Sequence, residues 1–152
     1  MQDDTLELVI SIGHFARAYQ RFDEARYLFD RLALIYPRRA FPYIGLGLVE
    51  LDRANYRRAS LLFGRAVDVV PDSALARAWL GVCQVLEGHY ALGVRMLMTV
   101  ADGSEPNASS MAEAFLALPE CAPYTYTASA AHVAQNAASH STIKRLTIRG
   151  GH

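Results

Sequence analysis

The chain has 152 residues, of which 52% are hydrophobic and 20% are charged. This composition is typical of one folded domain and excludes a disordered chain. Fifteen basic and fifteen acidic residues cancel, so the overall charge gives no reason to expect a nucleic-acid partner. The acidic start and the lack of a long apolar run predict neither a secretory signal nor an integral membrane segment.

The first part of the chain, up to Pro37, predicts a helical hairpin. Apolar residues at helical spacing indicate a helix over 5–19, and a turn at 20–22 leads to Asp23, a good N-cap. A second helix then runs to residue 35, and Pro37 stops it.

The next two segments repeat this plan. We expect helices over 41–54 and 57–70, followed by Pro71, and then a third hairpin that begins with Asp72 or Ser73 as its cap. The third hairpin turns at Gly88-His89, and its second helix ends near residue 101.

Small residues recur at the same interval as these hairpins. Gly13, Gly47 and Gly81 recur at one constant interval in the first helices, and Ala25, Ala59 and Gly93 recur at the same interval in the second helices. A glycine inside a helix costs about 1 kcal/mol, so its repetition needs a reason. We predict that the two helices of each hairpin cross closely at these positions.

The second repeat carries the most complete pattern, with Leu46, Gly47, Tyr56, Ala59, Phe63, Ala66 and Pro71. This pattern resembles the tetratricopeptide repeat over about residues 6–105. The resemblance implies an all-α fold of three stacked hairpins, at 6–39, 40–73 and 74–105, that form a right-handed α-solenoid. It also implies that the first helix of each hairpin lines a concave groove.

The residues after Pro106 differ in character. Ser110 with Glu113 resembles a capping box, so we expect a short helix within 106–119 that caps the last repeat. Residues 120–152 contain no acidic residue after Glu120 and are rich in Ala, Ser and Thr. We expect a mobile, weakly basic tail with a weak helix over 128–138.

Enzymatic and metal-binding patterns are absent from the sequence. It has no phosphate loop, nucleophile elbow or zinc-binding histidine pair, and Cys83 and Cys121 match no metal spacing. We therefore expect no catalytic residue, no cofactor and no metal. The cysteines are expected to be free thiols in a cytoplasmic protein.

The groove that the resemblance implies is apolar. Its predicted client-binding residues are Ile10, His14, Phe41, Ile44, Leu48, Leu51, Trp79, Val82 and Val85. The Lys, Arg and Asn clamp with which some family members hold acidic C-termini is absent. An exposed apolar surface of this kind usually marks an interaction site, so we predict a protein or peptide client with apolar anchors.

Three alternatives stay open for these residues: they are covered by the chain's own tail, they form a homodimer interface, or they pack between neighbouring repeats. A general scaffold subunit of a multiprotein assembly would share the fold and bind through other surfaces.

A small three-repeat chain with an apolar groove resembles the class II chaperones of bacterial type III secretion, which hold translocator proteins before export. Residues 41–47 and 79–84 are similar to stretches of that family. The resemblance implies binding without catalysis in the bacterial cytoplasm. Those chaperones dimerise through a helical segment before the repeats, and this chain starts almost directly in the first repeat, so we do not expect that mode of dimerisation.

Overall fold

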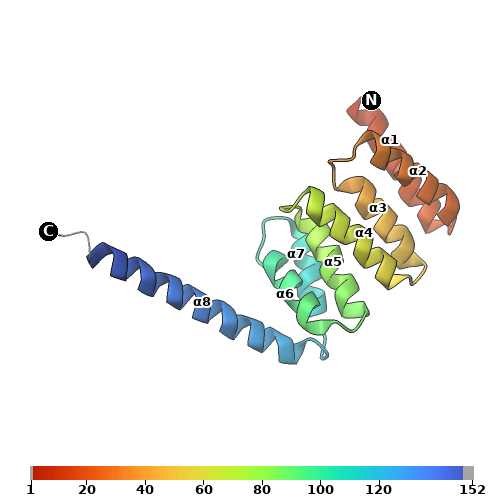
Figure 1. Cartoon of the computed structure of the whole chain (residues 1–152). Coiled ribbons are helices and arrows are strands. Elements are labelled where there is room, and N and C mark those ends of the chain that lie inside the picture. The colour runs from red at the N-terminus through yellow and green to blue at the C-terminus, as the bar shows by residue number, and fades with distance from the viewer. Residues whose placement is uncertain (1, 149–152) are drawn as a thin grey trace.

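The computed structural model describes residues 2–148, and the described chain is helical throughout, without strands (Figure 1). Its helices are α1 (Asp3–Ala18), α2 (Phe22–Ile35), α3 (Phe41–Asp52), α4 (Tyr56–Val69), α5 (Ala74–Leu86), α6 (Tyr90–Ala101), α7 (Pro106–Leu116) and α8 (Ala122–Ile148).

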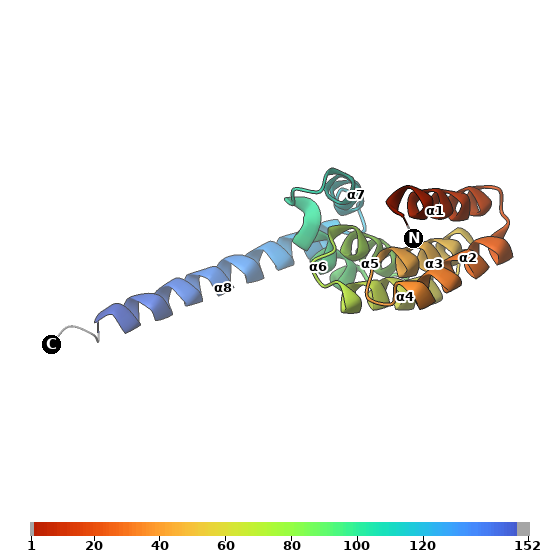
Figure 2. The same ribbon diagram turned by 90° about the horizontal axis from the view of Figure 1, so that it is seen from above.

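The first six helices form three hairpins, α1–α2, α3–α4 and α5–α6, stacked side by side. Each second helix also packs against the first helix of the next hairpin. In Figure 2, α1, α3, α5 and α7 form one row and α2, α4 and α6 form the other. The first row curves, because α1 and α7 at its ends stand above α3 and α5 (Figure 2). The predicted stack of three tetratricopeptide-like hairpins is confirmed.

The repeated glycines lie where the helices of each hairpin cross. A Cβ atom on Gly13 would lie 2.8 Å from Cζ of Phe29, and one on Gly47 would lie 2.5 Å from Cε1 of Phe63. In the third hairpin a Cβ on Gly93 would lie 2.8 Å from the carbonyl oxygen of Gly81. The glycines therefore make room at each crossing, for a phenylalanine ring in the first two hairpins and for the opposite backbone in the third.

The turns inside the three hairpins share one backbone feature, a residue with positive φ. Gln20, Ala54 and Gly88 occupy equivalent positions and all have positive φ, at 59°, 59° and 84°. Ser73 caps α5 as predicted, because its Oγ accepts a hydrogen bond from the backbone N–H of Ala76 at 3.3 Å. The prediction for Asp23 was wrong by two residues: α2 begins at Phe22, so Asp23 lies in the first turn, where a carboxylate still favours the helix dipole.

Helix α7 begins earlier than the predicted capping box. Glu105 is its N-cap, with side-chain oxygens that accept from the backbone N–H groups of Asn107 and Ala108. Ser110 therefore lies inside the helix, and the capping-box interpretation was wrong. Helix α7 packs against α5 and α6, and its buried Ala108 and Ala112 cover the third hairpin.

Helix α8 replaces the predicted weak helix over 128–138 with 27 helical residues. The segment 124–148 contains neither Gly nor Pro, so nothing in its sequence ends the helix. Its first part lies against α6, where the rings of Tyr124 and Tyr90 stack with centroids 6.0 Å apart, and the rest runs away from the stack (Figure 1). No helix in the described chain is both long enough and apolar enough to span a membrane. The mobility of the tail stays a prediction.

Candidate functional site

The surface that the curved row of first helices presents is the candidate site, and we call it the inner face. On α5, Gly81 and Val85 contact α6, whereas Leu75, Trp79 and Leu86 lie on the opposite side of the helix by their spacing. The equivalent side chains one repeat earlier are Phe41 and Asp52, whereas Gly45 between them is buried and faces the ring of Phe29 on α2. We define the inner face by these residues on α3 and α5, together with Glu7, Ser11 and Ala18 on α1.

Two aromatic rings of the inner face are held by neighbouring rings. Trp79 stacks on the fully buried Phe63 of α4, with centroids 5.9 Å apart and an interplanar angle of 15°. The ring centroids of Phe41 and Tyr36 lie 5.5 Å apart, and Cζ of Arg39 lies 5.7 Å from the Phe41 ring centroid. Both rings are half-buried, so each keeps an accessible part in a fixed orientation.

The nine predicted client-binding residues divide into two groups. Ile10, His14, Phe41, Leu51 and Trp79 are half-buried. The other four are buried, with exposed fractions of 2–8%: Ile44, Leu48, Val82 and Val85. That all nine bind a client stays a prediction.

Two of these four face the next hairpin, and the other two face α6 and α7. Ile44 and Leu48 pack with Ala76 and Cys83 of α5, and Val82 and Val85 pack with residues of α6 and α7. Packing between repeats therefore contributes to the burial of Ile44 and Leu48, and packing within the third hairpin and against α7 accounts for that of Val82 and Val85. An Ile44→Asp substitution would leave an unpaired carboxylate in this core and destabilise the fold, so it does not isolate client binding.

Sequence reasoning missed Leu86 and Asp52, which lie at equivalent positions at the ends of α5 and α3. Leu86 is 42% exposed although it is large and apolar, and the Asp52 side chain is 35% exposed. The signal was available: both positions follow a groove residue directly, and on the helix they lie closer to Trp79 and Gly45 than Val85 and Leu51 do.

An ion pair between Arg17 and Asp52 links the first two hairpins beside this face. Nε of Arg17 on α1 lies 2.9 Å from Oδ2 of Asp52 on α3. His14 lies one turn before Arg17, and its ring centroid is 5.0 Å from that of Phe29. Burial, and then the nearby Arg17, lower the pKa of His14, so its neutral form is favoured. Burial raises the pKa of Asp52, although Arg17 acts against this shift.

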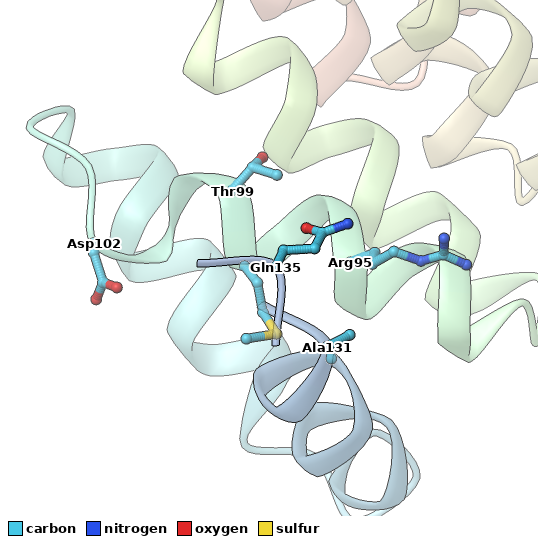
Figure 3. Close-up of a pocket in the computed structure, with 7 residues that line it drawn as sticks. Arg95, Thr99, Asp102, Ala131 and Gln135 are labelled. Carbon is cyan, nitrogen blue, oxygen red and sulfur yellow. The ribbon is translucent and has the colours of Figure 1, made fainter. Parts of the chain in front are cut away.

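A separate cavity of ≈ 410 Å³ opens between α6 and α8 (Figure 3). Figure 3 shows Arg95 and Thr99 of α6, with Asp102 directly after that helix, on one side and Ala131 and Gln135 of α8 on the other. It lies outside the row of first helices, and no sequence pattern predicted it. Within residues 2–148, no group of three or more His, Cys, Asp or Glu side chains is arranged to hold a metal ion.

No protein-family model and no curated protein sequence matches the chain. Solved structures do match. The type III secretion translocator chaperone SycD of Yersinia enterocolitica superposes with a TM-score of 0.64, covering 76% of this chain and 83% of SycD at 16% identity. The chain shares the fold of SycD.

Two further structures support the same fold. A T3SS complex from Aeromonas hydrophila matches with a TM-score of 0.64 and 17% identity, covering 76% of this chain and 80% of the matched chain. SycD in complex with a peptide of the translocator YopD matches with a TM-score of 0.61 and 19% identity, covering 74% of this chain and 93% of SycD. At these identities the likeness concerns the arrangement of the helices.

Proposed function

We propose that the chain is a chaperone that binds an apolar segment of a client protein on its inner face, without catalysis. The observation that carries the proposal is the apolar row of Leu75, Trp79 and Leu86 along one side of α5, in which Leu86 is 42% exposed and Leu75 and Trp79 are half-buried. Leaving such side chains in water costs about 25 cal/mol per Å² of apolar surface, and a client segment would remove that cost.

The half-buried predicted residues are the direct contacts in this proposal. Trp79 is the central anchor, because large aromatic side chains in fixed orientations dominate protein interfaces. Phe41 and Leu51 extend the contact across α3, and Ile10 and His14 extend it to α1. The four buried residues would contribute indirectly, because their packing fixes the positions of α3 and α5: Ile44, Leu48, Val82 and Val85.

We infer further that the client is a secretion translocator or a protein of similar chemistry. The fold shared with SycD supports this, since one of the matched structures holds a translocator peptide. A chaperone of this kind would act in the cytoplasm before export. It would keep an apolar segment of the client from aggregating.

A scaffold that binds through its outer helices is the second candidate. Leu34 on α2 and Leu61 on α4 are 73% and 70% exposed, and both belong to the outer row. Large apolar residues at these positions would suit a flat partner surface. The two functions therefore differ in which row of helices meets the partner.

A matched pair of substitutions separates the two candidates. Leu86→Glu places a charge on the inner face, and Leu61→Glu places the same charge on the outer row; both sites are exposed, so both variants should fold. Chain purified from its source bacterium should retain one main partner in the Leu61→Glu variant and lose it in the Leu86→Glu variant. The reverse result would replace the chaperone with the scaffold.

The identified partner then allows a direct test with a synthetic peptide of its apolar segment. Trp79 is the only tryptophan in the chain, so its fluorescence reports on the inner face alone. Saturable quenching or a spectral shift on adding peptide, weakened in the Leu86→Glu variant, is the expected result. A peptide that binds without changing Trp79 emission would place the client elsewhere.

A further inference from the structure

One glycine of the stack faces open space. An added Cβ on Gly64, in the middle of α4, would meet nothing within 4 Å. A glycine in the interior of a helix lowers the stability of that helix, so packing within the chain gives no reason for Gly64. At the other glycines of the six stacked helices, an added Cβ would meet atoms of the neighbouring helix: Gly13, Gly45, Gly47, Gly81 and Gly93.

The internal repeat shows what the side of the helix with Gly64 can receive. The residue equivalent to Gly64 in the third hairpin is Met98 of α6. Met98 packs against the same core cluster as Ala128 of α8, and both line the cavity between α6 and α8 (Figure 3). Along this side, five residues of α6 and its C-terminal end face α8 across two cavities: Ala91, Arg95, Met98, Thr99 and Asp102. A second helix of the stack therefore receives a further helix on this side.

In the described chain, no further helix lies on the same side of α4. Helix α8 leaves the stack at α6 and runs away from α4 (Figure 1). Leu61, which is equivalent to Arg95, is 70% exposed, so a large apolar side chain stands in water beside a helical glycine. We call this surface the open side of α4 and define it by the residues equivalent to those on α6: Arg57, Leu61, Gly64, Arg65 and Asp68.

The open side of α4 is mainly basic. Arg57 and Arg65 lie one turn before and one turn after Leu61. The side chain of Arg65 lies over the ring of Tyr43, with its Cζ 5.7 Å from the ring centroid, and Arg58 adds a third exposed guanidinium beside Arg57. None of these three arginines forms an ion pair with a carboxylate of the described chain. The first turn of α4 contains no acidic residue, so the helix dipole and the arginines together favour an anionic partner here.

We propose that the open side of α4 binds an acidic amphipathic helix of a partner protein. Gly64 lets the backbone of that helix come close, because a glycine leaves no side chain between the two helices. Leu61 is the apolar anchor, and the arginines on either side of it pair with carboxylates of the partner. This surface belongs to the outer row of helices, so its partner and a client on the inner face can bind at the same time.

Two synthetic peptides of about 20 residues, long enough to form a helix, are the probes. Both carry the same leucine stripe, and the positions beside the stripe are Glu in one peptide and Lys in the other. In calorimetric titrations of the full chain, the Glu peptide should bind at least about 10-fold more tightly than the Lys peptide, and added salt should weaken its binding. Equal affinities, or no binding of the Glu peptide up to about 1 mM, would overturn the proposal.

Charge reversal on α4 tests where the Glu peptide binds. The Arg57→Glu/Arg65→Glu double variant should prefer the Lys peptide, because the open side of α4 then carries the opposite charge. Leu61→Glu should weaken binding of the Glu peptide at least about 10-fold, as expected for an apolar anchor. Circular dichroism should show unchanged helicity, because all three side chains are exposed. An undiminished preference for the Glu peptide in the double variant would show that the peptide binds elsewhere.

Gly64→Ala separates the stability of the chain from its binding. Alanine is favoured inside a helix, so this variant should raise the urea midpoint of unfolding. The added methyl group keeps the two helices apart, so the same variant should bind the Glu peptide at least about 10-fold more weakly. A more stable Gly64→Ala variant that binds the Glu peptide as tightly as the unsubstituted chain would contradict close approach at Gly64.

Two control variants place a charge on other exposed apolar surfaces. Leu34→Glu lies on α2, where Leu34 is 73% exposed, and Leu86→Glu lies on the inner face, where Leu86 is 42% exposed. Both should bind the Glu peptide as the unsubstituted chain does. Loss of binding in Leu86→Glu but not in Leu61→Glu would place the peptide on the inner face and overturn the proposal.

Discussion

The close crossing of α3 and α4 predicts different effects on stability for two Gly→Ala substitutions in one hairpin. A Cβ on Gly47 would lie 2.5 Å from Cε1 and 2.8 Å from Cδ1 and Cζ of Phe63. Phe63 is fully buried and stacked on Trp79, so its ring cannot move aside freely. A Cβ on Gly64 of α4 would meet nothing within 4 Å.

The magnitudes follow from two competing effects. Replacing a helical glycine by alanine stabilises a helix by about 1 kcal/mol. Overpacking a dense core costs about 1–3 kcal/mol. Gly64→Ala gains the first effect without the second, so it should raise the free energy of unfolding by about 1 kcal/mol. Gly47→Ala carries both effects, so the two variants should differ by about 1–3 kcal/mol.

Urea unfolding followed by circular dichroism at 222 nm measures this difference. The Gly47→Ala/Phe63→Leu double variant adds a check, because a smaller side chain at residue 63 should relieve the clash and make the two substitutions non-additive. If Gly47→Ala stabilises the chain as much as Gly64→Ala does, the backbones are not held together at Gly47. The explanation of the constant glycine interval would then be wrong.

The turns, the buried histidine and the thiols give three further predictions. Ala54→Gly should raise the free energy of unfolding by up to about 1 kcal/mol, and Gly88→Ala should lower it by about 1–2 kcal/mol, because both positions have positive φ; thermal unfolding of the two variants measures this. The folded-state pKa of His14 is below its ordinary value of 6.5, so the unfolded chain binds more protons, and stability should fall as the pH falls through 6.5. His14→Gln should flatten this part of the stability profile, and an unchanged profile would contradict the burial of the ring. Burial raises the pKa of Cys83 to about 12, so the thiol should resist iodoacetamide at pH 8 until the chain unfolds, and rapid labelling of the folded chain would contradict its position between α4 and α5.

The fold could be predicted from the sequence because the repeat acts as an internal alignment. Gly13, Gly47 and Gly81 face large side chains across each hairpin, and only a close crossing explains three helical glycines in equivalent places. The interval therefore predicted the number of hairpins and the pairing of their helices. Ser73 was also predictable, since it is a good capping residue at the start of an apolar helix.

The ends of the chain were harder to predict, because they lie outside the repeat. Glu105 caps α7, although Ser110 with Glu113 matches the more common capping pattern. Helix α8 is built from residues of moderate propensity without an apolar stripe, so periodicity gave no sign of its length. Its contact with α6 depends on Tyr124 and Ala128, which pack against a partner that sequence spacing does not reveal.

The candidate site was predicted on the first helices of the hairpins, and the structure divides the predicted residues into buried and half-buried ones. Neighbouring faces of one helix differ by a single residue in spacing, and apolar side chains on α5 occupy both the face toward α6 and α7 and the face that carries Leu86. Hydrophobicity alone cannot separate the two. Burial does so, because Val82 is 2% exposed and Leu86 is 42% exposed.

The repeat also separates the residues that build the fold from those that give the inner face its chemistry. Core positions stay alike from hairpin to hairpin, as at Ala25 and Ala59. The open positions change: Glu7 is followed by Phe41 and Leu75 at the equivalent positions of the next two repeats. Packing accounts for part of this change, since Phe41 and Leu75 pack partly against the preceding hairpin, whereas Glu7 on α1 is exposed. The inner face therefore runs from polar on α1 to apolar on α5, and a client segment that matched it would place its apolar anchors over Trp79 and its polar end near Glu7 and Ser11.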